Sequence, residues 1–477
     1  MLAPNSAEVY ELFINGKVVA ASERERLERR HPSTQELVAT YARATRGDTL
    51  NAVQAAKRAF ESSAWRQMVP SERARLIERA GIELEKSDNA LARTIMREVG
   101  KPIDGAMAEV KEGCALWRYA AASLRSLRGE LYPALAPGFE GQTFFEPVGV
   151  VGLILPWNFP FLVAAERLPF ILAAGCTVVV KPSEYAAGTA FQIAEVLRRI
   201  GVPDGVYNVV TGVGDEAGEA LVESPDVSMI SFTGSTENGR RVAERASRTF
   251  KRLSLELGGK SPVVLFADAD FERAVQAVIS GFTYNAGQCC IATSRLIIER
   301  SAKEKFKRLL VEQLASLAAT FTQPAATEAQ HRRVVEFIDL GKREAEVVYG
   351  GSAALPYGSP VSPVVFDNIP RDSRIGKEEI FGPVLSISAF NTEDEAVAVA
   401  NDTIYGLAAC VWSGDVSRAI RVAKRIRAGR LWVNSAQENF PEMPVGGFGA
   451  SGLGREAGTF GIRTYCEVKS MIIRTQS

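Results

Sequence analysis

The stretch VGVVGLILPWNFPFLVAAERLPFILAAGCTVVVKPSE, residues 148–184, decides the fold of this chain. It begins and ends with short, nearly unbroken apolar runs, VGVVGLIL and CTVVVK, and a helical pattern lies between them. Similar runs follow as VYNVV (206–210), VSMISF (227–232) and PVVLF (262–266). Unbroken apolar strands that alternate with helices are typical of a parallel sheet covered on both faces. The stretch therefore predicts a doubly wound, Rossmann-like α/β domain.

A second alternation of the same kind runs from about residue 270 to 435. It predicts helices over 270–288, 302–315, 393–401 and 415–427, and strands over 295–299, 384–390, 408–413 and 430–433. Ahead of residue 148, Asn15-Gly16 predicts a hairpin turn, and helices are expected over 48–63, 70–99 and 103–128, the first with Asp48 as its N-cap. The segment SLAATFTQPAATEAQ (316–330) is expected to be a loop. We expect ligands at the carboxyl ends of the strands.

Composition excludes several functional classes. Fifty-six basic and 56 acidic residues give no net charge, so no nucleic-acid partner is expected. The opening MLAPNSAEVYELF lacks signal-peptide features, and no apolar run reaches the roughly 20 residues that span a bilayer, so we expect no membrane partner. Six cysteines without disulfide spacing indicate a reducing, cytoplasmic compartment. With only two histidines, no metal site is expected.

Polar residues gather where strands are expected to end. Asn158 follows the first strand, Glu256 ends the strand in LELGGKS, and FTGSTENG (232–239) opens a helix that suits an anion. Lys181 and Glu184 lie in KPSE, and Glu379 and Phe381 lie in EEIFGPV. The glycine-rich TGVGDEAG (211–218) has the wrong spacing for a dinucleotide motif and reads better as a plain turn. Each motif alone could be a turn or a cap, but together they indicate a functional site.

Two adjacent cysteines stand in NAGQCCIATS (285–294). Neighbouring cysteines suit neither a zinc site nor a disulfide, so each is either a buried core residue or a nucleophile. The residue pattern alone does not choose between these readings of Cys289 and Cys290.

Over nearly its full length the chain resembles the aldehyde dehydrogenase superfamily. The resemblance is carried, in family order, by PWNFP, KPSE, FTGSTENG with LELGGKS, NAGQCCIATSR, EEIFGPV, and VGGFGASGLGREAG. The family's nucleophile occupies the last place of G-[QE]-x-C, which here is Cys290, and Cys289 falls on a neighbouring, non-reacting position. The resemblance also implies that the Asn158 amide and the Cys290 backbone N–H bind the oxyanion, and that Glu256 is the general base.

The same resemblance implies an NAD site and a substrate pocket. The expected cofactor residues are Trp157, Lys181, Ser183, Glu184, Gly234, Ser235, Leu257, Glu379 and Phe381. The Glu184 carboxylate would repel a 2′-phosphate and so favours NAD, with NADP as a secondary possibility through Lys181. The expected substrate residues are Phe159, Val163, Glu166, Tyr284, Asn439 and Val445.

Glu166 suggests the class of aldehyde. The family commonly has a tryptophan at this position, and relatives that oxidise succinate semialdehyde have an arginine. Val163, Glu166 and Phe170 are expected on one helix face, and the segment AQENFPEMPVGG (436–447) that closes the tunnel is polar. These features predict a preference for amino or polyhydroxy aldehydes over dicarboxylic semialdehydes. The alternative is that Glu166 simply pairs with a nearby arginine.

The resemblance implies three structural units. Residues 1–128 and 147–257 form the NAD-binding domain, 258–450 the catalytic domain, and 129–146 with 451–477 a small β oligomerisation element. The tail TYCEVKSMIIRT (464–475) could add a strand to a partner's sheet in a homodimer or homotetramer.

One departure from the family is that the G-D-P…G-P loop after the 302–315 helix is missing, which affects local packing. Two rivals remain: a CoA-acylating dehydrogenase, against which Glu256 argues, and a non-catalytic relative, against which the full residue set argues.

Overall fold

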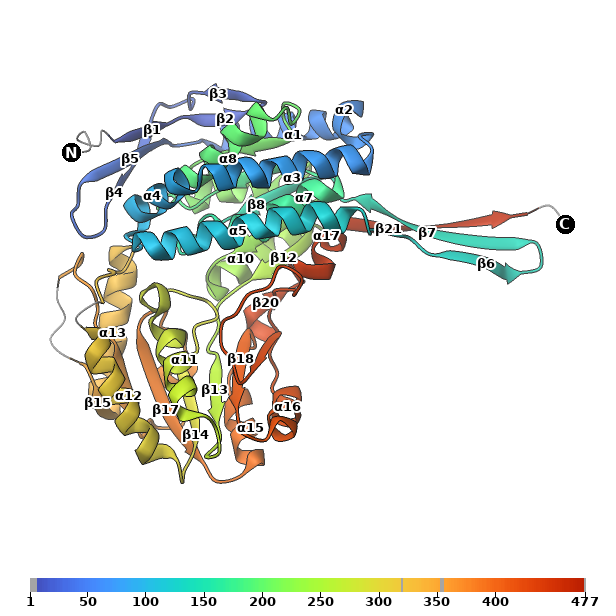
Figure 1. Cartoon of the computed structure of the whole chain (residues 1–477). Coiled ribbons are helices and arrows are strands. Elements are labelled where there is room, and N and C mark those ends of the chain that lie inside the picture. Colours follow the sequence, from blue (N-terminus) through green and yellow to red (C-terminus); the bar gives the residue numbers. More distant parts are fainter. Residues whose placement is uncertain (1–6, 319–320, 352–355, 476–477) are drawn as a thin grey trace.

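The computed structural model describes residues 7–318, 321–351 and 356–475, which form two lobes and a projecting arm (Figure 1). An eight-stranded sheet supports the first lobe. In spatial order its strands are β20 (Gly452–Leu453), β12 (Arg252–Glu256), β11 (Met229–Thr233), β8 (Val150–Ile154), β9 (Thr177–Lys181), β10 (Tyr207–Val209), β2 (Leu12–Ile14) and β3 (Lys17–Val19). A small sheet beside it has the order β1 (Glu8–Tyr10), β5 (Leu37–Ala42) and β4 (Arg26–Arg30).

The centre of the first sheet is doubly wound, as predicted. Strands β8 to β12 are all parallel, and the chain moves outward from β8 to β9 and β10 before it returns to β11 and β12 on the other side. The strand order therefore reverses between β8 and β11, which is where such sheets bind ligands. The predicted hairpin is confirmed, since β2 and β3 pair around Asn15 and Gly16, both with positive φ.

Helices cover both faces of this sheet. One face packs against α3 (Pro70–Lys86), α4 (Asp88–Val99), α5 (Ile103–Leu124), α7 (Leu168–Ala174) and α8 (Gly188–Arg199). The other face packs against α1 (Arg46–Glu61), α9 (Glu219–Glu223) and α10 (Thr236–Ser247). Alternate residues of β8 serve the two cores, with Val151 and Leu153 on one side and Val150 and Ile154 on the other. The short helices α2 (Ser63–Arg66) and α6 (Leu162–Ala165) complete the lobe.

The second lobe repeats this design, which confirms the second predicted alternation. Its sheet has the order β15 (Glu346–Tyr349), β16 (Val364–Asp367), β17 (Val384–Phe390), β14 (Arg295–Glu299), β13 (Pro262–Leu265), β18 (Ala408–Trp412) and β19 (Arg430–Val433). All except β15 are parallel. The helices are α11 (Phe271–Thr283) and α12 (Lys303–Ala318) on one face, α15 (Glu393–Asn401) and α16 (Val416–Arg425) on the other, and α13 (Glu328–Glu344) and α14 (Arg374–Lys377) at the β16 edge.

Several predicted helices differ from the observed ones. The helix predicted over 70–99 is interrupted at Ser87, whose hydroxyl turns back to the carbonyl of Glu83. The N-cap of α1 is Thr45 rather than Asp48, and Asp48 is the acidic partner in its capping box. The helix expected after PWNFP is split into α6 and α7 ahead of Pro169, so Val163 and Phe170 lie on different helices and Glu166 lies between them.

The second lobe adds three corrections. The helix predicted over 270–288 ends at Thr283, because Asn285, Ala286 and Gly287 take left-handed φ values of 53°, 56° and 72°. The predicted loop 316–330 is shorter, since α12 extends to Ala318 and α13 begins at Glu328. The sequence reading placed no element over most of α13, β15 or β16.

The arm consists of β6 (Leu131–Ala136), β7 (Phe139–Pro147) and β21 (Cys466–Arg474), in the order β21-β7-β6 (Figure 1). Strand β21 pairs with β7 in antiparallel register from Cys466↔Pro147 to Arg474↔Phe139. Its outer residues include Val468 and Ile472, which are 64% and 71% exposed. Before the arm, residues 452–453 pair with β12, so the chain crosses the first lobe before it enters β21.

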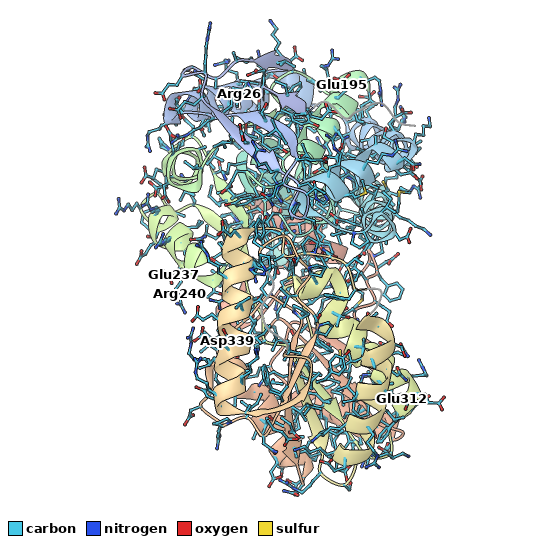
Figure 2. All side chains as sticks on the ribbon, turned by 90° about the vertical axis from the view of Figure 1, so that its left-hand side faces the viewer. Arg26, Glu195, Glu237, Arg240, Glu312 and Asp339 are labelled. Atoms are coloured by element: carbon cyan, nitrogen blue, oxygen red, sulfur yellow. The ribbon has the colours of Figure 1, made fainter. Side chains whose placement is uncertain are left out.

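Charged side chains cover the outside of both lobes. Figure 2 shows six of them at the periphery: Arg26, Glu195, Glu237, Arg240, Glu312 and Asp339. Within the described parts of the chain, none of the helices has the length and apolar character needed to cross a membrane.

Candidate active site

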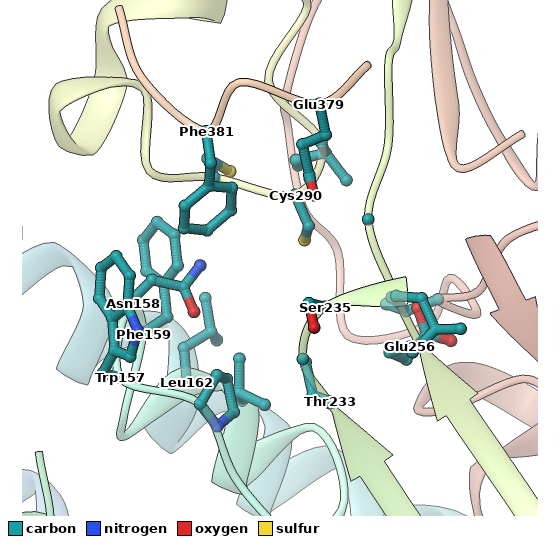
Figure 3. Close-up of a pocket in the computed structure, with 18 of the residues that line it drawn as sticks. Trp157, Asn158, Phe159, Leu162, Thr233, Ser235, Glu256, Cys290, Glu379 and Phe381 are labelled. Atoms are coloured by element: carbon teal, nitrogen blue, oxygen red, sulfur yellow. The ribbon is translucent and has the colours of Figure 1, made fainter. Parts of the chain in front are cut away.

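A cavity of about 540 Å³ is lined by residues of both lobes. Most of the predicted site residues meet there: Trp157, Asn158, Phe159, Val163, Glu166, Gly234, Ser235, Glu256, Leu257, Tyr284, Cys290, Glu379, Phe381, Asn439 and Val445. Lys181, Ser183 and Glu184 do not line it and lie instead at the carboxyl end of β9, beside β8. Figure 3 shows Cys290 pointing into the cavity, with Asn158 on one side and Glu256 on the opposite side.

The two sheets present opposite ends to this cavity. The first sheet contributes the carboxyl ends of β8, β11 and β12, as expected. The second sheet contributes segments that precede β14 and β17, which carry Cys290 and Glu379. The expectation that ligands lie at carboxyl ends is therefore wrong for the second sheet.

Glycines allow the motifs to meet backbone to backbone. A Cβ on Gly287 would lie 2.2 Å from the carbonyl carbon of Gly382, and one on Gly259 would lie 2.6 Å from the carbonyl oxygen of Cys290. The glycines of GQCC, FGPV and LGGK thus permit three distant segments to close around one thiol.

The two cysteines differ in exposure. Cys289 is 6% exposed, whereas Cys290 is partly exposed and points into the cavity (Figure 3). A hydrogen bond with the Cys289 thiol, followed by burial and the nearby carboxylates of Glu166 and Glu256, holds the pKa of Cys290 well above its usual value. A positive charge brought into the cavity would therefore favour the thiolate form of Cys290.

Glu256 has the surroundings of a base that works near neutral pH. It ends β12, is buried, and its Oε1 has no hydrogen-bond partner within the described part of the chain. Burial raises its pKa to about 8; Glu456 and Glu166 add to this increase and Arg167 opposes it. A carboxyl group with such a pKa exchanges protons near neutral pH.

Glu379 and Phe381 belong to the segment before β17 that lines the cavity. Glu379 Oε1 accepts a hydrogen bond from the Gly259 backbone N–H at 3.0 Å, and burial raises its pKa to about 7. The Phe381 ring meets Trp157 edge to face, with centroids 5.6 Å apart. Helix α13 holds this segment, since Gln330 Nε2 donates to the carbonyl of Phe381 at 2.7 Å and Arg333 Nη2 donates to that of Glu379 at 2.5 Å.

The turn between β11 and α10 brings a helix N-terminus to the cavity. Ser235 is the N-cap of α10, and its hydroxyl accepts a hydrogen bond from the backbone N–H of Asn238 at 3.2 Å. Gly234 and Ser235 line the cavity at the point where the strand order reverses. A helix N-terminus in this place suits the pyrophosphate of a dinucleotide.

Comparison with known proteins identifies the family. The sequence model of the Aldehyde dehydrogenase family matches residues 18–471. The chain belongs to the aldehyde dehydrogenase family. Its fold superposes on a crystal structure of NAD-dependent aldehyde dehydrogenase from Sinorhizobium meliloti with a TM-score of 0.95, at 40% identity over 98% of this chain and 95% of that one.

Two further relatives concern the cofactor and substrate. An NAD+ complex of aldehyde dehydrogenase from Bacillus cereus superposes with a TM-score of 0.95, at 35% identity over 98% of this chain and 97% of that one. Aminoaldehyde dehydrogenase 1, peroxisomal, from Pisum sativum is 37% identical over 97% of this chain and 95% of the relative.

This aldehyde dehydrogenase has cavity residues that sequence reasoning missed. Glu112, on α5, also lines the cavity, and burial followed by the Glu166 carboxylate raises its pKa to about 7. Arg167 is almost fully buried; its Nη1 lies 2.9 Å from Glu166 and its Nε 3.9 Å from Glu456. Glu166 thus does pair with a neighbouring arginine. Glu112 lies on α5 and Arg167 between α6 and α7, and no local pattern marks either as a cavity residue. Helix α13, which carries Gln330 and Arg333, was itself not predicted.

The segment without the family's G-D-P…G-P loop packs against the loop that carries Cys290. Gln323 Nε2 donates to Asn285 Oδ1 at 2.6 Å, and the Ala326 backbone N–H donates to Gln288 Oε1 at 2.8 Å. Residues 319–320 of this segment lie outside the described residues. The shortened segment therefore supports the loop that carries Cys290.

Proposed function

We propose that this aldehyde dehydrogenase oxidises an aldehyde to the carboxylic acid with NAD, using Cys290 as the nucleophile. The observation that carries the proposal is the meeting of Cys290, Asn158 and Glu256 around one cavity. Cys290 adds to the carbonyl carbon, and the Asn158 amide, with the Cys290 backbone N–H, stabilises the oxyanion of the thiohemiacetal. NAD, when bound, accepts the hydride that this adduct releases. Glu256 then takes a proton from the water that hydrolyses the remaining thioester, which frees the acid and Cys290.

The residues present fit NAD. We assign Glu379 to the nicotinamide ribose and Phe381 to the face of the ring, and Trp157 and Leu257 line the same cavity. Gly234 and Ser235, at the N-terminus of α10, suit the pyrophosphate. At the end of β9, Lys181 and Ser183 lie with Glu184, whose carboxylate is 3.5 Å from Lys181 Nζ, and we assign these three to the adenosine ribose. The carboxylate favours NAD over NADP, since it would repel a 2′-phosphate.

The preferred substrate is an amino, ammonium or polyhydroxy aldehyde. Glu112 and Glu166 both line the part of the cavity that we assign to the substrate. The two carboxylates lie close enough to interact, since Glu166 is one cause of the raised pKa of Glu112. Phe159 and Tyr284 stack at 5.7 Å near them, and Val163, Asn439 and Val445 complete the wall. A cation would relieve the repulsion between the carboxylates. The named function of the Pisum sativum relative supports this class.

We also propose roles for the three structural units. We assign residues 1–128 and 147–257 to NAD binding, 258–450 to catalysis, and 129–146 with 451–477 to assembly into a homodimer or homotetramer. Both edges of the arm, β6 and β21, lack a neighbouring strand among the described residues, which supports pairing with a partner. A cytoplasmic location is supported by six free cysteines.

The first test is NADH formation from an aldehyde and NAD, with and without CoA. We expect NADH and free acid, and no dependence on CoA. Acyl-CoA as the product would favour the CoA-acylating alternative, although the buried Glu256 argues against it. The absence of NADH with every aldehyde in a broad panel would favour a non-catalytic relative.

A further inference from the structure

Asn285 lies beside Asn158, whose side-chain amide we assign to the oxyanion, and joins it to the loop that carries Cys290. Its Nδ2 donates to the carbonyl oxygen of Asn158 at 3.0 Å and to that of Gln288 at 3.0 Å. The side-chain Nδ2 of Asn158 donates to the same Gln288 carbonyl at 3.1 Å. These bonds close a ring that fixes both the backbone and the side chain of Asn158 relative to the loop that carries Cys290. The Asn158 amide keeps one more hydrogen, which can meet an oxyanion.

The orientation of the Asn285 amide is itself fixed. Gln323 Nε2 donates to Asn285 Oδ1 at 2.6 Å, so the oxygen faces Gln323 and the nitrogen faces Asn158 and Gln288. Gln288 Nε2 in turn donates to the backbone carbonyl of Asn285 at 3.0 Å. Asn285, Gln288 and Gln323 are all buried, so these bonds are shielded from competing water.

The Asn158 carbonyl is held from a second direction. Lys101 Nζ donates to it at 3.0 Å, and the same ammonium group forms a buried ion pair with Glu109. Glu109 Oε1 also accepts hydrogen bonds from the backbone N–H groups of Phe161 at 2.9 Å and Leu162 at 3.2 Å. The turn that carries Asn158 is therefore anchored to α5 on one side and to Asn285 on the other.

The backbone at Asn285 is unusual. Asn285 and Ala286 have left-handed φ and ψ values of 53°, 37° and 56°, 32°, followed by Gly287 with φ 72°. Side chains disfavour this region, although asparagine tolerates it better than most residues. Such conformations persist where surrounding contacts enforce them, and they gather at functional sites. Asn285 could simply stabilise this turn, and the experiment must separate that role from one in catalysis.

We propose that Asn285 is a positioning residue for the reaction: through Asn158 it fixes the amide that binds the negative oxygen of the thiohemiacetal. The inference rests on the proposed dehydrogenase function. An oxyanion donor is effective only when it is already oriented before the charge develops. Loss of the Asn285 amide should therefore slow the steps up to hydride transfer and leave NAD binding unchanged.

The decisive variant is Asn285→Gly, since glycine accepts the left-handed backbone and only the amide is lost. Its matched control is Ala286→Gly, which changes the neighbouring backbone and removes none of the ring's hydrogen bonds. The readouts are the rate constant of the first-turnover NADH burst, NAD affinity by calorimetry, and Tm. We expect Asn285→Gly to slow the burst at least about 10-fold, and Ala286→Gly to change it less than about 3-fold. A burst as fast as that of wild type in a folded Asn285→Gly protein would overturn the proposal.

A double-mutant cycle tests whether Asn285 acts through Asn158. In an Asn158→Ala background, adding Asn285→Gly should have little further effect on the burst. Fully additive losses would overturn the proposal. If Asn285→Gly does not fold, Gln323→Met keeps the turn and removes the bond that orients Asn285; it should slow the burst in the same direction, and an unchanged burst would also overturn the idea. A wild type without any burst, or an Asn158→Ala variant with full activity, would instead count against the proposed function.

Discussion

Arg167 donates a hydrogen bond to the Glu166 carboxylate at 2.9 Å, so part of the charge of Glu166 is balanced from inside the protein. Glu112, on the same cavity, has no ion pair of this kind among the described residues. Burial and Glu166 raise its pKa to about 7, so a cation beside it would stabilise its charged form. Selectivity for charge should therefore depend on Glu112 at least as much as on Glu166.

We expect Glu112→Gln to lower kcat/KM for an ω-aminoaldehyde by roughly 5- to 20-fold, about the effect of one partly screened charge. The value for an uncharged aliphatic aldehyde of the same length should change little, and this substrate is the control. Glu166→Arg should lower kcat/KM for the aminoaldehyde further and raise kcat/KM for succinate semialdehyde. If wild type prefers succinate semialdehyde, or if both changes leave the ranking intact, the carboxylates do not select the substrate.

A second prediction separates the two cysteines. Cys290→Ala should abolish dehydrogenase activity, because its thiol is the one that points into the cavity (Figure 3). Cys289→Ala should keep most of it and should also lower the pKa of Cys290, since the hydrogen bond with Cys289 is the first cause of its increase. The pH dependence of inactivation by iodoacetamide measures that pKa. Equal losses of activity from both substitutions would contradict the assignment of Cys290 as the nucleophile.

The sequence revealed the parts of the fold in which each element has its own local signal. Strands such as β8 and β9 are buried on both faces, so they appear as unbroken apolar runs. Helix α13 was missed although it has such a signal. Thr327 caps its N-terminus, and Val334, Phe337 and Ile338 recur at helical spacing on its buried face.

In the candidate site, some residues have a local signal and others do not. Asn158 and Cys290 stand in turns with distinctive residues, Glu256 ends β12 just before Gly258 and Gly259, and the resemblance to a family assigned their roles. Glu112 and Arg167 lie on or between helices, where a charged residue usually faces water. Only the packing of α5 against α6 and α7 turns them toward the cavity.

A third prediction concerns stability and pH. Burial raises the pKa of Glu98 to about 7, whereas hydrogen bonds from Tyr41 and the Gly188 backbone N–H oppose the increase. The folded protein therefore binds this proton more tightly than the unfolded chain, which releases it near pH 4.5. This contribution to the free energy of unfolding is full below about pH 4.5 and is lost as pH rises toward 7. Denaturant titrations across this window should show a smaller decrease in the free energy of unfolding for Glu98→Gln than for wild type. If that free energy changes equally with pH in both proteins, Glu98 is not the group responsible.

A fourth prediction concerns assembly. The arm exposes Val468 and Ile472 on strand β21, and both should be covered in a dimer or tetramer. Light scattering at micromolar concentration should give at least twice the mass of one chain. The double change Val468→Lys with Ile472→Lys should shift the protein toward monomers, while Lys469→Arg on the same strand, which keeps its charge, is the control. A wild-type monomer would refute the prediction.

The last prediction places Glu256 after hydride transfer. Its Oε1 lies buried without a hydrogen-bond partner in the described structure, available to a water molecule at the thioester. Glu256→Gln should slow steady-state turnover roughly 100-fold or more, within the range that general base catalysis supplies, while the first turnover still yields about one NADH per active site.

The pH profile gives an independent check on that assignment. A base must be deprotonated to act, so in wild type the rate of deacylation should rise with pH through about 8, the value to which burial, Glu456 and Glu166 raise the pKa of Glu256. In Glu256→Gln this rise should disappear, while the pH dependence of the NADH burst, which reports Cys290, should remain. Asp226→Asn, which changes a surface carboxylate paired with Lys57, serves as the control and should keep both profiles. A Glu256→Gln variant that forms no NADH burst would show that the glutamate acts earlier, to activate Cys290, because a base needed only for hydrolysis cannot affect the first hydride transfer.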